Sequence, residues 1–171
     1  MALPRKLKNL NCFNDGNNYM GVVQSFTMPK LTRKLEAYRG GGMHGAVNVD
    51  LGLDDGALDV SWTCGGMIES LLNQYGVTGA GTCQLRFTGA MQRDDTGDVD
   101  AVEIVVRGRH KEIDHGEWKP GETAAITVSS VCSYFKLSIN GAVLIEIDLL
   151  NMVEIVNGVD RQAEHRKALG I

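Results

Sequence analysis

Apolar and polar residues alternate at every second position through much of this chain, and this pattern constrains the fold more than any other feature. The alternation is clear from Leu58 to Trp62, from Cys83 to Phe87 and from Val102 to Val106. Successive side chains of a β-strand point to opposite faces, so each segment is typical of a strand with one buried and one exposed face. The sequence therefore predicts a mainly β protein.

Turn signals separate the predicted strands. Asn140 and Gly141 lie between a long β-rich run, Thr123 to Ile139, and the alternating segment from Val143 to Ile147. Both central residues of a type I′ turn need a positive φ, so this pair predicts a β-hairpin. The Asp- and Gly-rich segment Arg93–Asp98 is expected to join two more antiparallel strands. Further strands are expected at 17–27 and 30–38. About eight strands at short spacing favour a sandwich or barrel of antiparallel sheets.

Two segments have helical features. Apolar residues recur at helical spacing from Met67 to Tyr75, between glycines, which predicts one helix over 66–76 that flanks the sheets. A weaker helix is expected from Asp160, a suitable N-cap, to Gly170, a suitable C-terminal stop. This second helix has few apolar residues to bury. Two interpretations of the C-terminal segment stay open: an arm that packs against a neighbouring subunit, and a frayed tail.

The segment 39–56 combines a glycine-rich loop with a strand-like pattern. Loops longer than about 12–15 residues are uncommon in compact domains. Within this loop Val47, Val49, Leu51 and Leu53 alternate with polar residues and glycine. One interpretation is an extra edge strand of the domain's own sheet. The other is an extension that contacts another subunit.

The search for catalytic and ligand-binding motifs favours no enzyme. His110, Glu112 and Asp114 would share one face of a regular strand and could bind a metal, although a solvated strand end is the favoured interpretation. The acidic turn that begins at Asp94 lacks the glycine and the closing glutamate of a calcium loop. Phosphate-binding loops, nucleophile elbows and zinc motifs are absent from the sequence. We therefore expect no catalytic residue, no metal and no cofactor.

Composition excludes several other classes. The net charge of −4 argues against a protein that wraps nucleic acid with a basic surface. The longest apolar runs are too short to cross a bilayer, and the first ten residues are not expected to act as a signal peptide. Four cysteines without a C-x-x-C pair are expected to be reduced thiols. The length predicts one domain, 1–171. An assembly protein whose function lies in its interfaces is favoured over a β-sandwich binding module. In such a module Trp118 would be the candidate binding residue in a loop.

Several long sequence blocks carry a family resemblance. They include MALPRKLKNLNCF at the start, MPKLTRKLEAYRGGGMHG, VDLGLDDGAL, QRDDTGD, VRGRHKEID, and INGAVLIEIDLLNMVEIVNGVDRQAEHRKALGI at the end. In these blocks, and over essentially its whole length, the chain resembles the major tail tube proteins of contractile-tailed temperate bacteriophages. The resemblance implies two packed antiparallel sheets with one flanking helix, a long glycine-rich loop and extended terminal arms. It also implies hexameric rings that stack into the inner tube of a contractile tail.

The resemblance further implies partners and a location. The partners would be other copies of the chain, the tail sheath, the baseplate and a tape-measure protein. Phage DNA would pass through the lumen without specific binding. An acidic subunit is suited to this role, because each cationic contact would add affinity for phosphate. The protein would belong to the virion tail, assembled in the bacterial cytoplasm, with no membrane insertion of its own. A tube of a contractile bacteriocin or a defective prophage is the alternative.

Residue roles follow from the resemblance as expectations. The arms would be 1–16 and 157–171, and the loop 39–56 would contact the next ring. Candidate inter-ring residues are Met43, Val47, Val49, Leu51 and Leu53. Candidate subunit-arm residues are Arg161, His165 and Arg166. Candidate channel residues are Asp59, Ser61, Glu103, Thr127 and Ser129, and Thr63, Lys34, Glu36 and Arg107 would share the same wall.

Overall fold

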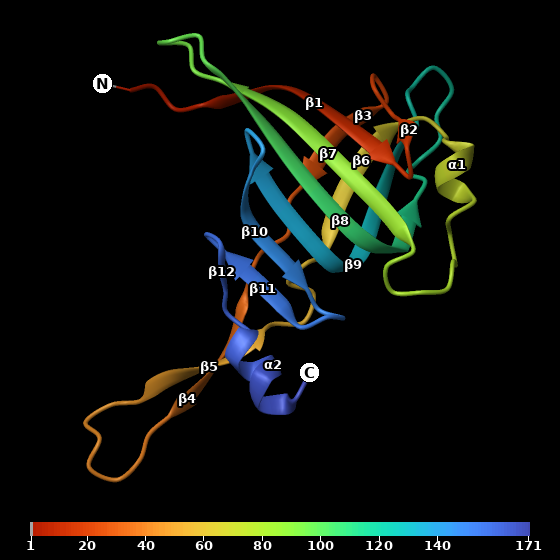
Figure 1. The fold of residues 1–171 in the computed structure, drawn as a ribbon. Coiled ribbons are helices and arrows are strands. Elements are labelled where there is room, and N and C mark those ends of the chain that lie inside the picture. Colours follow the sequence, from red (N-terminus) through yellow and green to blue (C-terminus); the bar gives the residue numbers. More distant parts are fainter. Residues whose placement is uncertain (1) are drawn as a thin grey trace.

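The computed structural model describes residues 2–171, and strands make up most of its regular structure, which confirms the predicted mainly β class (Figure 1). The strands are β1 (Lys6–Asn14), β2 (Asn17–Asn18), β3 (Val23–Thr27), β4 (Arg33–Tyr38), β5 (Val47–Leu53), β6 (Val60–Gly65), β7 (Cys83–Gln92), β8 (Val99–Asp114), β9 (Ala125–Ile139), β10 (Ala142–Asp148), β11 (Val153–Val156) and β12 (Val159–Asp160). The helices are α1 (Glu69–Leu72) and α2 (Ala163–Leu169). Neither is long and apolar enough to cross a membrane.

Two strands, β8 and β9, are shared by two packed layers. The C-terminal half of β9 pairs with β10, and its N-terminal half pairs with β6, which in turn pairs with β3. The front layer contains β10, β9, β8, β7 and β1, whereas the back layer contains β3, β6, the start of β9 and the end of β8 (Figure 1). The register of β8 shifts between Arg107 and Gly108 and again between His110 and Glu112. Such bulges bend a strand, which lets β8 pass from one layer to the other.

The hydrophobic core lies between the layers. The apolar positions of the three alternating segments, from Leu58, from Cys83 and from Val102, are all buried, as the pattern predicts. The Phe26 and Phe87 rings stack with centroids 3.7 Å apart, and Trp62 meets Phe87 edge-on at 6.1 Å. Aromatic contacts of this kind add to the stabilisation from area burial.

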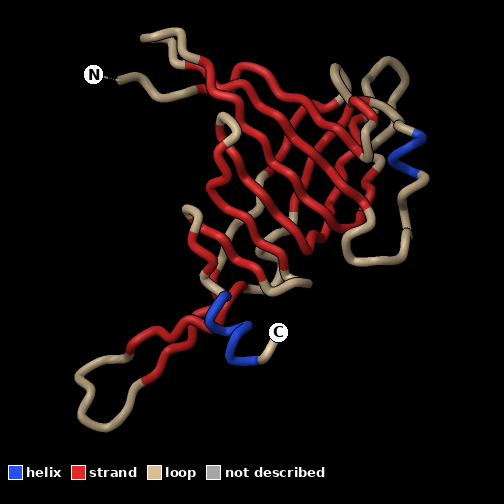
Figure 2. The backbone as a smooth tube through the Cα atoms, in the orientation of Figure 1, coloured by secondary structure: helices blue, strands red, loops and turns tan. Residues whose placement is uncertain are grey.

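Strands β4 and β5 form a separate two-stranded sheet. This hairpin projects from the sandwich at the end where α2 lies (Figure 2). The interpretation of 39–56 as an edge strand of the domain's own sheet is therefore wrong. The glycine-rich part, residues 39–46, is the tip that connects the two strands.

Both ends of the chain differ from the predicted arms. Residues 6–14 were assigned to the arm 1–16. They instead form β1, which pairs with β7 and extends the front layer by one strand. The predicted strand 17–27 is divided into β2 and β3 by a turn in which Val22 N donates to Tyr19 O at 3.0 Å. The C-terminal segment forms β12 and α2, and is neither frayed nor a single helix from Asp160.

The helix boundaries show how local signals compete with tertiary contacts. Helix α1 spans four residues, far fewer than the predicted 66–76, and turns surround it. Helix α2 has Gln162 as its N-cap, because Asp160 lies in β12 and its carboxylate is bound by Arg166. Gly170 ends α2 in the left-handed region at φ 77°, as predicted. Asn140 and Gly141 also have the positive φ values expected of the hairpin turn, 51° and 81°.

A partly buried polar network fixes the segment around α1 to the sandwich. Gln74 Nε2 donates to Asn14 Oδ1 at 3.0 Å and to Asp15 Oδ2 at 2.7 Å, so its Oε1 is the acceptor facing His110 Nε2 at 3.0 Å. His110 Nδ1 then accepts from Ser130 Oγ at 2.9 Å. His110 is 6% exposed, and burial lowers the pKa of its imidazole below the ordinary value of 6.5. The neutral ring thus stabilises the link between β8 and the α1 segment.

We expect the free energy of unfolding of the full chain to fall as the pH drops from 7 to 5. The unfolded imidazole takes up a proton near pH 6.5, whereas the folded one, whose pKa is lowered, does not, so acid favours the unfolded chain. Urea unfolding at the two pH values measures the slope. His110→Gln should flatten it, and His165→Gln, at an exposed helix position, should not. A slope that is the same in parent and His110→Gln would contradict this assignment.

We expect Gly108→Ala to destabilise the fold by roughly 2 kcal/mol or more, since overpacking a tight site costs about 1–3 kcal/mol. A Cβ at Gly108 would collide with the Val131 carbonyl oxygen and the Cys132 Cα, both of them backbone atoms that cannot move aside cheaply. Thermal unfolding checks this expectation. The matched control is Gly45→Ala, because a Cβ there meets nothing within 4 Å. Equal stability of the two variants would show that the β8–β9 crossing tolerates a side chain.

Candidate assembly surfaces

The outward face of the back layer consists mainly of small hydroxyl side chains. Ser61 pairs with Ser129 and Thr63 pairs with Thr127, while the intervening Trp62 and Val128 are buried. The neighbouring strands extend the same face. We call this set the hydroxyl face, and its members are Ser25, Thr27, Ser61, Thr63, Thr127 and Ser129, with Glu112 and Asp114 at the β8 side. Arg109 of β8 lies at one end of this face, because its partner Val131 continues the outward side of β9 after Ser129, and Lys30 and Lys111 line a shallow cavity at the margin with Asp59.

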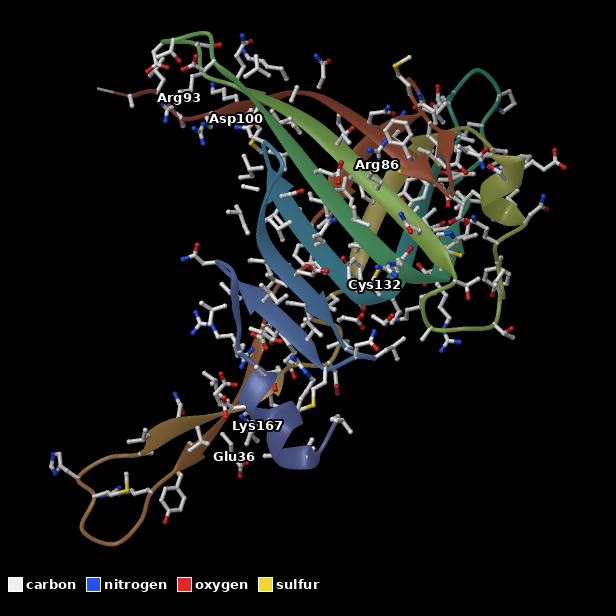
Figure 3. The ribbon with its side chains drawn as sticks, viewed as in Figure 1. Glu36, Arg86, Arg93, Asp100, Cys132 and Lys167 are labelled. Atoms are coloured by element: carbon white, nitrogen blue, oxygen red, sulfur yellow. The ribbon has the colours of Figure 1, made fainter. Side chains whose placement is uncertain are left out.

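The outward face of the front layer is different, because it carries paired charges. Arg86 Nη1 lies 3.3 Å from Glu103 Oε2, and the guanidinium of Arg107 lies 3.9 Å from the centroid of the Tyr134 ring. Tyr134 in turn donates its hydroxyl to Glu146 at 2.8 Å. Figure 3 shows Arg86 on this layer.

The predicted channel residues therefore divide among three places. Ser61, Thr127 and Ser129 lie together on the hydroxyl face, and Asp59 precedes them at its margin. Glu103 and Arg107 lie on the front layer, so the expectation that they share the wall with Ser61 is wrong. The reason is that β8 and β9 change layers along their length. Lys34 and Glu36 belong to β4 of the hairpin, away from both layers.

The structure separates the candidate metal ligands. His110 faces the core, whereas Glu112 and Asp114 are exposed on the hydroxyl face. The bulge at Lys111 adds one residue and reverses the alternation, which sequence spacing alone does not reveal. Within residues 2–171 no group of three or more potential ligands is placed to hold a metal ion.

The cysteines and Trp118 supply no alternative site. All four cysteines are buried and unpaired, and burial raises the pKa of Cys12 and Cys132 to about 12. Such thiols stay protonated at neutral pH and are poor nucleophiles. Trp118 is exposed in the loop 115–124, and none of the aromatic pairs within residues 2–171 includes it. An aromatic binding groove, which a β-sandwich binding module would favour, is not formed around it.

Both edges of the back layer are free. Among residues 2–171, β3 pairs only with β6, and the last residues of β8, 109–114, pair only with β9. Their outward N–H and C=O groups can accept a further strand.

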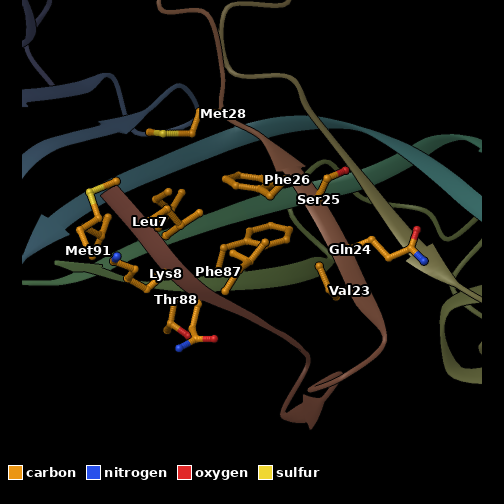
Figure 4. Close-up of a pocket in the computed structure, with 15 residues that line it drawn as sticks. Leu7, Lys8, Val23, Gln24, Ser25, Phe26, Met28, Phe87, Thr88 and Met91 are labelled. Atoms are coloured by element: carbon orange, nitrogen blue, oxygen red, sulfur yellow. The ribbon is translucent and has the colours of Figure 1, made fainter. Parts of the chain in front are cut away.

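An apolar seam lies beside the free edge of β3. It is a cavity of about 530 Å³ between β3 and β1, and Figure 4 shows Phe26 and Phe87 at its centre. Leu7, Met28 and Met91 line the seam as well. The two layers are thus left open along this side of the sandwich.

The hairpin presents an exposed apolar strip. Tyr38 pairs with Val47, and Val49 pairs with Glu36, so one face carries Tyr38, Val47, Val49 and Leu51, which we call the hairpin strip. Its members are 46–61% exposed. The register shifts between Arg33 and Leu35, which turns Leu53 to the opposite face, where it packs against the core. The expectation that Leu53 continues the strip is therefore wrong. Met43 is half-buried at the tip, where its sulfur accepts from Gly40 N at 3.1 Å.

The candidate arm residues of the C-terminal segment differ in their availability. Arg166 binds Asp160 and donates to Met152 O at 2.7 Å, so it holds α2 to its own subunit. Arg161 and His165 are exposed. Helix α2 has no buried residue, and Leu169 and Ile171 are exposed at its end.

Comparison with known proteins relates the chain to phage tail proteins. Residues 4–170 match the family described as Phage tail tube protein FII. The chain is 54% identical to the tail tube protein of Escherichia phage P2 over 172 residues, covering 100% of both chains. It is 46% identical to the major tail tube protein of Serratia phage KSP20 over 153 residues, covering 90% of this chain and 88% of the relative.

A solved structure supports the fold independently. A chain in the six-fold symmetrised cryo-EM structure of the anti-feeding prophage baseplate superposes with a TM-score of 0.54 at 10% identity, covering 81% of this chain and 97% of that chain. At this identity the likeness concerns the fold alone. Together with the match over residues 4–170, the full-length identity to the P2 protein assigns the chain: it belongs to the phage tail tube protein FII family.

Proposed function

We propose that this chain is a structural subunit that forms hexameric rings, and that the rings stack into the inner tube of a contractile phage tail, the conduit for DNA ejection. It requires no cofactor and catalyses no reaction. The observation that carries this proposal is the back layer, whose hydroxyl face lies between two free strand edges. A sheet of this kind is completed by copies of itself.

The directions of the edge strands suit ring formation. Each strand of the back layer is antiparallel to its neighbour in the order β3, β6, β9, β8, so β3 and β8 run in opposite directions. When β8 of one copy lies beside β3 of the next, the two form an antiparallel pair. This head-to-tail contact repeats identically and closes into a ring when its rotation allows. The neighbour would also cover the apolar seam between β3 and β1.

The hydroxyl face lines the channel in this arrangement. Most of its side chains are small hydroxyls, so a passing phosphate backbone meets few attractive contacts. Glu112 and Asp114 offset the positive charges of Arg109 and Lys111 on the same strand end, so the face has no excess of cations for phosphate. DNA therefore passes without specific binding.

The hairpin strip contacts the adjacent ring. Exposed apolar side chains on a projecting hairpin are costly in an isolated subunit and mark a surface that another chain covers. Val47, Val49 and Leu51 are the inter-ring residues, with Tyr38 beside them, and Met43 supports the tip from within. Arg161 and His165 contribute a polar contact from the C-terminal segment.

The remaining surfaces meet the other tail components. The outside of the tube faces the sheath, one end rests on the baseplate, and the lumen holds the tape-measure protein during assembly. The location is the virion tail, after assembly in the cytoplasm of the bacterial host. The family match and the P2 relative support this context.

We expect Ser61→Lys combined with Ser129→Lys to leave tubes intact and to slow DNA ejection, most strongly at low salt, because lysines repeated around the lumen attract phosphate and salt screens this attraction. Ejection is followed by dye binding to released DNA. The control is Gln84→Lys, an exposed position on the outward face of β7 in the front layer that does not line the seam. If intact tubes of the double variant eject DNA at the unchanged rate, the hydroxyl face does not line the channel.

We expect Val47→Lys with Leu51→Lys to abolish stacking while the subunit stays folded, because two charges would be buried at the ring contact and neither position lies directly opposite a carboxylate of the hairpin. Negative-stain microscopy and sedimentation measure assembly, and circular dichroism measures folding. Asn48→Lys is the matched control, since this residue lies on the same hairpin and faces away from the strip. Long tubes formed by the double variant would contradict the role of the strip.

A further inference from the structure

The root of the hairpin has little hydrophobic support. Every residue of β4 is exposed, and in β5 only Gly52 and Leu53 are half-buried. Asp54 N donates to Thr32 O at 2.9 Å, which closes the root, and Leu53 packs on the core. These contacts attach the hairpin at its base. They do not by themselves fix the angle at which it leaves the sandwich.

Arg33 makes the charged contact that crosses from the hairpin to the sandwich. Its Nε donates to Asp50 Oδ2 at 2.8 Å, across the two strands of the hairpin. Its Nη1 donates to Glu154 Oε1 at 2.7 Å, on β11 of the main sheet. The planar guanidinium therefore binds both hairpin strands and the sandwich at once, which a lysine ammonium cannot do with the same geometry.

Both carboxylates that Arg33 binds are themselves held in place. Asp50 Oδ1 accepts from Gly52 N at 2.8 Å, and the pKa of Asp50 is lowered by that backbone N–H and by Arg33. The Glu154 side chain is 14% exposed, and its main-chain oxygen accepts from Arg161 N at 2.7 Å. Strand β11 lies between β10 and β12. The anchor on the sandwich side is thus part of a paired sheet.

We infer that Arg33 is a positioning residue, which holds the hairpin at a fixed angle to the sandwich before assembly so that the hairpin strip is presented to the neighbouring copy. The assembly part of this inference rests on the proposed function. A hairpin that is already oriented loses less conformational freedom when it docks, so association is stronger for the same contact area. Arg33 touches no residue of the strip, and acts through the direction of β4 and β5.

The first measurement concerns the isolated, unassembled full chain. Spin labels on cysteines introduced by His44→Cys at the hairpin tip and Arg109→Cys on β8 report their separation, because both positions are exposed and the native thiols are buried. We expect a narrow distance distribution in the parent and a broad one in Arg33→Ala, Arg33→Lys and Glu154→Gln. Lys34→Ala is the matched control: it removes the adjacent cation of the same strand, on the other face of the hairpin, and should leave the distribution narrow.

The second measurement concerns assembly. We expect the subunit concentration needed for tubes to rise roughly tenfold in Arg33→Ala, which corresponds to about 1.4 kcal/mol of association free energy. Combining Arg33→Ala with Glu154→Gln should add little to either change, because both remove one shared contact. Light scattering as a function of subunit concentration gives the concentration needed for tube assembly and requires no cysteine labels.

The outcomes separate this inference from the function on which it rests. A narrow distribution in both Arg33→Ala and Glu154→Gln would overturn the positioning role, whatever the strip does. A broad distribution with an unchanged assembly concentration would show that the angle does not matter for docking, and would overturn the assembly part. If the lysine-substituted strip still forms tubes while Arg33→Ala broadens the distribution, the proposed stacking contact fails and the positioning of the hairpin stands.

Discussion

The fold depends on one constraint, the pairing of β8 with β9 while both strands pass from the front layer to the back. The crossing brings the two backbones so close at Gly108 that no side chain fits. The register shifts on either side of that point bend β8, and the bend separates the two outward faces. Trp62, Phe87 and the rest of the core fill the space that this arrangement encloses.

The same constraint leaves the sandwich incomplete. The N-terminal half of β9 pairs with β6, and the back layer ends at β3 on one side and at β8 on the other. The apolar seam beside β3 stays open because β1 belongs to the front layer. The subunit therefore has unpaired strand edges, and both the seam and the projecting hairpin strip expose apolar surface. Association with identical copies would pair the edges and cover the apolar surface.

Charge follows the same division between the layers. The front layer pairs Arg86 with Glu103 and Arg107 with Tyr134, whereas most side chains of the hydroxyl face are small and uncharged. At the hairpin root, charge has a mechanical role, since Arg33 connects Asp50 with Glu154. A hydrogen bond between His110 and Gln74 likewise connects β8 with the α1 segment.

The sequence by itself determined the strands around Trp62, Phe87, Ile104 and Val128, their buried faces, the Asn140–Gly141 turn and the Gly170 stop, because these depend on period-two alternation and on local backbone preference. It also identified Ser61, Thr127 and Ser129 as one polar face, and Val47, Val49 and Leu51 as one exposed strip. It did not predict β1, which was assigned to the N-terminal arm. Only the tertiary structure decided that Glu103 lies on the other layer, that His110 is buried apart from Glu112, and that Leu53 turns into the core. Each of these outcomes follows from a register shift or a layer crossing, and both are set by contacts between distant strands that no local pattern records.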